Sequence, residues 1–212
     1  NSTAWLHSVN TWSGMRKRFI KCDLPGFPEG VGAKDEEMLE FYQNHLERIR
    51  EFAKRYPSHR LIEVSINDEK AGDILASAFR LDATCWGHSN KAGDSKTKIK
   101  ARKTKSGQPP ILSVGLPQPG STSIHDFFEC NGLRSSRYAP PIRDNLQHQL
   151  APLYGFDESF DVISQLATTI PPSNCYYPQI QALEEIHQYY PNMTLVLNKQ
   201  TGPAWLRSVN EW

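Results

Sequence analysis

Apolar residues recur with two different periods along this chain, which predicts helices that alternate with short strands. Over residues 34–55 they recur every three or four positions, as on the buried face of one helix. Over residues 61–66 every second side chain is apolar, which predicts a strand, and a helix through 75–79 follows it. A further helix is predicted over residues 3–20.

The second half of the chain shows the same alternation. After a stretch to Ser173 that is predicted to be irregular, strands and helices resume; the predicted elements are a strand over 111–114, a helix over 121–130, a helix over 179–190, a strand over 194–197 and a helix over 204–212. Short apolar strands that alternate with helices indicate βαβ units. We therefore expect an α/β fold, a parallel sheet flanked by helices on both faces.

The composition is that of a globular protein with a sizeable core. The 212 residues are 38% hydrophobic and 22% charged and include 9 Phe, 8 Tyr and 5 Trp, so wholesale disorder is excluded. No apolar run is long enough to span a bilayer, and the first twelve residues lack the features of a signal peptide. The four cysteines form no C-x-x-C pair, so we expect no zinc site and expect buried thiols, with disulfides as the alternative in a secreted chain.

Charge is concentrated in one segment. Residues 89–109 carry seven Lys or Arg residues and one Asp, a net +6 in a chain whose total is +1. Because Gly, Ser and Thr surround these charges, we expect a solvated basic linker. A nucleic-acid arm is the alternative, but no aromatic residue stands among the lysines to stack on bases, so no nucleic-acid partner is expected.

The two ends of the chain repeat one another. Residues 4–12 (Ala-Trp-Leu-His-Ser-Val-Asn-Thr-Trp) recur at 204–212 (Ala-Trp-Leu-Arg-Ser-Val-Asn-Glu-Trp), with seven of nine positions identical, two of them Trp. This self-similarity indicates a repeating unit. We expect residues 1–88 to be the C-terminal part of one copy, 89–109 the linker, and 110–212 the N-terminal part of the next copy.

A glycine-rich loop lies between the strand at 111–114 and the helix at 121–130. It reads Gly-Leu-Pro-Gln-Pro-Gly-Ser-Thr-Ser over residues 115–123, and backbone N–H groups at such a helix start can bind an anion. The spacing is that of a Walker A loop, but Ser121 replaces the lysine, which disfavours an ATPase or kinase. Taken alone, the loop could equally be a plain turn in which a serine caps the helix.

Residues 111–132 resemble the start of sulfotransferases that use 3′-phosphoadenosine 5′-phosphosulfate, whose loop reads roughly P-K-[ST]-G-[ST]-[ST]. Residues 194–208 resemble the strand and helix that bind the 3′-phosphate in that family, and residues 177–187 resemble the helix before that strand. Residues 85–88 (Cys-Trp-Gly-His) resemble the C-terminal region of sulfotransferase-like proteins. The resemblance implies a P-loop NTPase-like sulfotransferase fold, here in circularly permuted order.

The resemblance also implies site residues. The loop residues Pro119, Gly120, Ser121, Thr122 and Ser123 would hold the 5′-phosphosulfate, and Ser208, with Ser8 as its equivalent in the other copy, would bind the 3′-phosphate. The chain departs from the family at two positions: Gln118 replaces the loop lysine, and Gln200, beside Lys199, replaces the 3′-phosphate arginine. His125, one helical turn beyond the loop, is the nearest candidate base, ahead of His88, His187 and His7.

Two functions from different classes follow from the resemblance. The first is transfer of a sulfuryl group from 3′-phosphoadenosine 5′-phosphosulfate to a hydroxyl or amine of a carbohydrate or small molecule, with no metal. The second is a catalytically impaired nucleotide-binding or scaffolding domain, because losing one charge-stabilising donor costs about 10²–10³ in rate. The compartment is left open between the cytoplasm and the Golgi lumen.

The repeat raises a question of placement. If the two segments form one permuted domain, strands 61–66, 111–114 and 194–197 share one parallel sheet, and that domain has one slot for the duplicated helix. We expect the N-terminal copy to occupy it, because its helix is longer. Trp205 and Trp212 would then be more exposed than Trp5 and Trp12.

Overall fold

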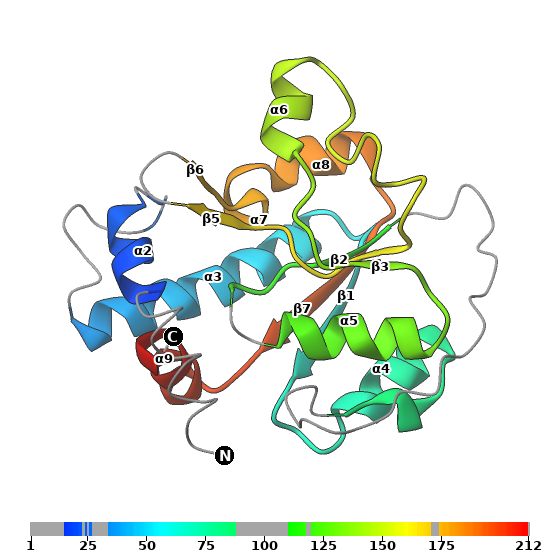
Figure 1. Cartoon of the computed structure of the whole chain (residues 1–212), viewed down its shortest axis with the longest axis horizontal. Coiled ribbons are helices and arrows are strands. Elements are labelled where there is room, and N and C mark those ends of the chain that lie inside the picture. The colour runs from blue at the N-terminus through cyan, green and yellow to red at the C-terminus, as the bar shows by residue number, and fades with distance from the viewer. Residues whose placement is uncertain are drawn as a thin grey trace.

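Five strands of the computed structural model form one parallel sheet in the order β1-β7-β2-β4-β3 (Figure 1). A separate antiparallel pair consists of β5 and β6. The bounds are β1 Arg60–Ser65, β2 Ile111–Ser113, β3 Ser135–Ser136, β4 Val162–Ile163, β5 Thr168–Ile170, β6 Asn174–Tyr176 and β7 Thr194–Lys199. The structure describes residues 15–22, 24, 26, 34–87, 110–117, 120–170 and 174–211.

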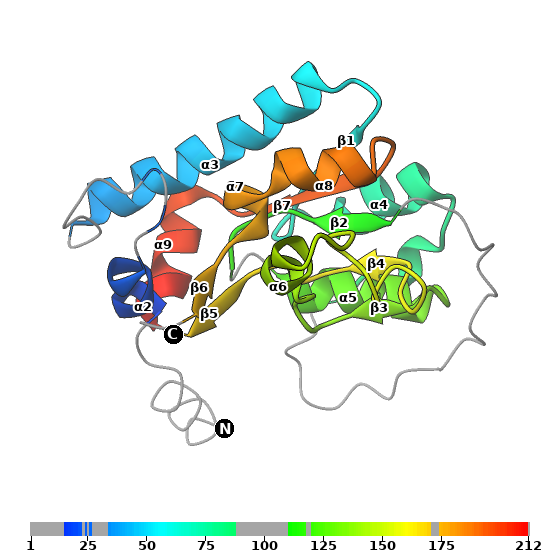
Figure 2. The same ribbon diagram turned by 90° about the horizontal axis from the view of Figure 1, so that it is seen from above.

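Helices cover both faces of the sheet, as the alternation of strands and helices predicted (Figures 1 and 2). One core packs beneath α3, α7, α8 and α9, and the other packs beneath α4 and α5. No helix within the described ranges is both long and apolar enough to cross a membrane. The bounds are α2 Met15–Lys21, α3 Asp35–Arg55, α4 Ala71–Phe79, η1 Ala83–Cys85, α5 Ser121–Cys130, α6 Ile142–Gln147, α7 Pro178–Gln181, α8 Leu183–Tyr189 and α9 Gly202–Glu211.

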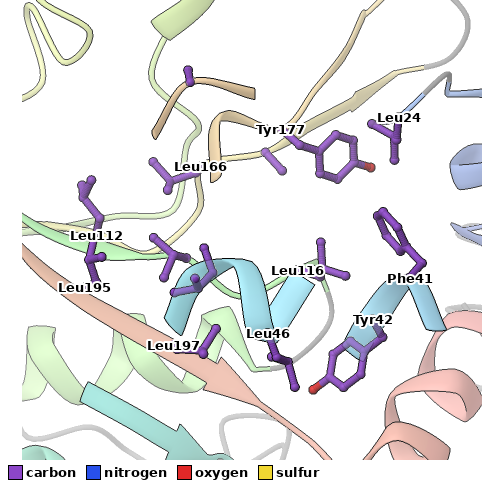
Figure 3. Close-up of a cluster of buried hydrophobic side chains, with 14 of the residues drawn as sticks. Leu24, Phe41, Tyr42, Leu46, Leu112, Leu116, Leu166, Tyr177, Leu195 and Leu197 are labelled. Atoms are coloured by element: carbon purple, nitrogen blue, oxygen red, sulfur yellow. The ribbon is translucent and has the colours of Figure 1, made fainter. Parts of the chain in front are cut away.

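The longest helix, α3, forms where the apolar period predicted it. Its start is fixed by Glu37, whose carboxylate accepts a hydrogen bond from the Lys34 backbone N–H at 3.1 Å, and three acidic residues in the first turn favour the helix dipole. Its apolar stripe meets the ends of β2 and β7 in the larger core (Figure 3). The buried residues of this stripe are Met38, Phe41, Tyr42, His45, Leu46, Ile49 and Phe52.

Both segments of the chain contribute to the one sheet, which confirms the predicted pairing. Strand β1, from the N-terminal segment, pairs with β7 over six positions, and β7 pairs with β2 on its other side. Two disulfides, Cys22–Cys175 and Cys85–Cys130, also join the segments, each with a Cα–Cα distance of 5.6 Å. The expectation of buried thiols is therefore wrong, because tertiary packing brings distant cysteines within bonding distance.

Two other expectations differ from the structure. The helix predicted over 179–190 is divided at Ala182, whose backbone (φ −142°, ψ 18°) is not helical, into α7 and α8. The stretch that was predicted to be irregular contains β3, α6, β4 and β5. These strands have two or three residues, which is too short for a period of two to show in the sequence.

The repeated C-terminal helix is not displaced. Helix α9 occupies a buried slot and Trp205 is 0% exposed, so the prediction that Trp205 would be displaced is wrong. Connectivity outweighs helix length here, because α9 begins three residues after β7 ends and this short connection keeps α9 beside the slot. Residues 1–14, including Trp5 and Trp12, lie outside the described ranges, as does Trp212.

Candidate functional site

The glycine-rich loop leaves the carboxyl end of the central strand β2 and enters α5. Gly120 is the residue before α5 and has a left-handed backbone (φ 68°, ψ 36°), which glycine adopts without strain. A Cβ on Gly120 would lie 2.8 Å from the Ile66 side chain, so the residue after β1 packs directly on this turn. The sequence motif therefore has the predicted position, between a strand and a helix.

The start of α5 has the properties of an anion site. No side-chain hydrogen bond caps this ten-residue helix within the described part of the chain, and its first turn holds no acidic residue. The backbone N–H groups of Ser121, Thr122 and Ser123 lie in that turn, where the helix dipole favours negative charge. Thr122 is exposed and the two serines are half-buried. An anion at this turn could receive both backbone and hydroxyl hydrogen bonds.

Buried side chains from three helices hold the first half of the loop through its carbonyl groups. His45 Nε2 of α3 donates to the Val114 carbonyl at 2.8 Å, and Gln179 Nε2 of α7 donates to the Gly115 carbonyl at 3.2 Å. Trp205 Nε1 of α9 donates to the Pro117 carbonyl at 3.3 Å. All three side chains are almost fully buried. Contacts with the core therefore hold the carbonyls of residues 114, 115 and 117 in place.

Asn198 joins the loop to β7. Its Oδ1 accepts hydrogen bonds from Ser113 Oγ at 2.6 Å and from the Gly115 N–H at 3.2 Å. A Cβ on Gly115 would collide with the backbone and the side chain of Asn198, so only glycine permits this close approach. The ends of β2 and β7 are thereby held together at the carboxyl edge of the sheet.

This edge is where parallel α/β sheets bind ligands. The chain passes from β2 through α5 to β3 on one side of the central strand, whereas β7 and β1 lie on its other side. The crevice at such a reversal of strand order, outside the carboxyl ends of the strands, is the general ligand position. The two elements that resemble the phosphate-binding elements of sulfotransferases, 115–123 and 194–208, are thus neighbours in space.

Lys199, the basic residue of the element at 194–208, forms an ion pair with a carboxylate of the protein itself. Lys199 Nζ forms an ion pair with Glu63 of β1, and Arg50 of α3 binds the same carboxylate at 2.7 and 2.8 Å. Hydrogen bonds from Arg50 and then Lys199 lower the pKa of Glu63 to about 2, against the raising effect of burial. Lys199 and Arg50 therefore share one carboxylate, which holds the Lys199 ammonium within the protein.

Gln200 is held through its backbone. Its N–H donates to Tyr42 Oη at 2.8 Å, and the same hydroxyl donates to the Gln200 carbonyl at 2.9 Å. The Tyr42 ring stacks on Trp205 with a centroid distance of 4.6 Å. Tyr42 therefore links the end of β7 to the indole that supports the loop.

Two of the other predicted site residues, Ser208 and His125, can be placed in the structure. Ser208 is half-buried on α9, one turn after Trp205, and His125 is half-buried in the second turn of α5. Gln118, Pro119 and Ser8 lie outside the described ranges. No group of three or more His, Cys, Asp or Glu side chains with metal-site geometry occurs among residues that the structure describes.

Sequence reasoning missed the side chains that support the loop. His45 belonged to the apolar stripe of the helix over 34–55, and a polar group at such a position was a signal of a buried hydrogen bond. Asn198 was a second signal, a polar residue directly after three apolar strand residues. Burial lowers the pKa of His45 to about 4, so its imidazole is neutral at pH 7. Nothing in the pattern singled out Gln179.

Comparison with known proteins gives no match: neither a protein-family model, nor a curated protein, nor a solved structure is similar to this sequence.

Proposed function

We propose that this chain is a sulfotransferase-like unit that binds 3′-phosphoadenosine 5′-phosphosulfate at residues 115–123 and transfers its sulfuryl group to a hydroxyl or amine acceptor. The observation that carries the proposal is the start of α5, which has no side-chain cap and lies at the reversal of strand order, after residues 114–117 that the core holds. The sequence resemblance at residues 111–132 and 194–208 supplies the ligand class. A P-loop NTPase-like sulfotransferase fold in permuted order is part of this proposal.

Each part of the site has a role in the proposed reaction. The N–H groups and hydroxyls of Ser121 and Thr122 would bind the phosphosulfate and stabilise charge on the phosphate as the sulfuryl group leaves. Ser208 would contact the 3′-phosphate, and His125 is the candidate base for the acceptor. Lys199 would contribute only after release from Glu63.

Thr122→Asp is expected to weaken nucleotide binding without weakening the fold. A carboxylate in the first turn of α5 favours the helix dipole but repels a bound phosphate, so affinity for 3′-phosphoadenosine 5′-phosphate should fall at least about tenfold. Calorimetry measures the affinity and thermal unfolding measures the fold. Asn44→Asp is the matched control, since it adds the same charge at an exposed site on α3. Equal affinity in both variants would place the ligand elsewhere, and stabilisation by ATP-Mg²⁺ alone would indicate an NTPase.

A binding domain without transfer activity is the second candidate, and the Lys199–Glu63 ion pair favours it. With that lysine bound to Glu63 and with Gln118 and Gln200 uncharged, no cation of the family pattern is free to stabilise the reaction. Restoring the family residues as Gln118→Lys and Gln200→Arg should tighten binding of the bisphosphate nucleotide, because each adds a charge-assisted hydrogen bond. Unchanged affinity by calorimetry would show that these two positions do not contact the phosphates.

A further inference from the structure

Helix α9 lies in a slot where Trp205 contacts Tyr42, Phe19 and the Pro117 carbonyl. Within the repeated segment, the buried residues of α9 are ones that both copies share. Trp205 stacks on Tyr42 at 4.6 Å, its centroid lies 6.1 Å from that of Phe19, and Val209 is 1% exposed. These buried residues are identical in the other copy, where they are Trp5 and Val9. Arg207, which is exposed on α9, is one of the two positions that differ. Among residues 204–210, the buried positions of α9 are therefore positions that both copies share.

The position of α2 shows that the N-terminal copy can reach the same slot. Near the end of α9, Asn210 Oδ1 accepts a hydrogen bond from Arg16 of α2 at 3.1 Å. The equivalent residue, Asn10, stands only six positions before Arg16 in the chain, and the three steps from Trp12 to Met15, where α2 begins, span about 10 Å when extended. A copy in the slot could therefore connect directly to α2, at the end of the slot opposite the connection from β7 to α9 (Figure 2).

We propose that the α9 slot is a docking site for residues 4–12 of the same chain, which exchange with residues 204–212. The slot accepts one indole at a time, because Tyr42 offers one stacking face there and the Pro117 carbonyl accepts one indole N–H. Since both copies present the same buried side chains, the contacts hardly distinguish them. The connections to β7 and to α2 set the balance, and α9 occupies the slot in this structure. The proposal does not depend on the nucleotide site.

A mutant cycle in the full chain tests the exchange. Trp5→Ala should leave the Tm unchanged, since α9 holds the slot. Trp205→Ala should lower the Tm only slightly because residues 4–12 replace α9. The double variant should lose about 10 °C, as expected when a buried Trp is truncated with no substitute. A cycle in which Trp205→Ala and the double variant unfold at the same temperature, or in which Trp205→Ala does not fold, overturns the proposal.

A peptide experiment identifies the occupant. A synthetic peptide of residues 1–14 added to the double variant should restore the Tm, and the same peptide with Trp5→Ala should not. Rescue in the single variant Trp205→Ala should be independent of protein concentration, because the tether makes docking intramolecular. A Tm that rises with protein concentration would assign the slot to a second molecule and overturn the intrachain form.

Discussion

Replacing Cys22 and Cys175 by Ala is expected to lower the free energy of unfolding by roughly 5 kcal/mol, and replacing Cys85 and Cys130 by roughly 4 kcal/mol, according to the entropy of loop closure in the unfolded chain. The difference follows from the separations of 153 and 45 residues. Because the shorter loop lies within the longer one, removing both should cost less than the sum. Denaturant unfolding under oxidising conditions measures each loss.

Two controls separate this expectation from ordinary packing defects. Wild-type protein that is denatured without reductant should show no titratable thiol, and four titratable thiols would contradict the disulfides. A protease site engineered into residues 88–109 provides the second control, because each disulfide crosses from residues 15–87 to residues 110–211. The cleaved protein should run as one species without reductant and as two with it.

Paired cysteines also bear on the compartment that the sequence left open. Disulfides persist in oxidising compartments and are rare in the cytosol. All four cysteines of the chain are paired. The pairing is therefore that of a chain that folds in an oxidising compartment.

Acidification from pH 7 to pH 4.5 is expected to destabilise the fold through His45. The pKa of this imidazole is about 4 in the folded chain and 6.5 as the ordinary value. Above pH 6.5 the group is neutral in both states and its contribution is fully present. As the pH falls toward 4, the unfolded chain takes up a proton that the folded chain excludes, and the free energy of unfolding falls by about 3 kcal/mol over the whole window.

His45→Gln is the matched variant for this measurement. Its amide N–H can still donate to the Val114 carbonyl, but it does not titrate, while all other acidic and histidine groups are unchanged. Urea unfolding at both pH values should therefore show a smaller acid-induced loss in the variant than in the wild type. Equal losses would mean that His45 is accessible to protons in the folded state.

The amino-acid pattern determined the elements that carry a full period. The helix over 34–55 and the strands at 61–66, 111–114 and 194–197 were predicted to within one or two residues, and the prediction that these strands share one parallel sheet is confirmed. The pattern missed the two- and three-residue strands between 135 and 176. In such short strands, pairing with neighbours rather than local periodicity decides the conformation.

By itself the sequence determined two features. One is the loop at 115–123, since its glycines fix the turn from strand to helix, and the other is the repeat at the two ends. Only the tertiary structure decided what surrounds them. The support of the loop by His45, Gln179 and Asn198, the pairing of Lys199 with Glu63, and the disulfides all join residues far apart in the chain. Likewise, the sequence contains two copies of the helix that could occupy one slot, and the short connection from β7 places α9 in it. Contacts of this kind depend on where the sheet places each strand end, and no local pattern records that.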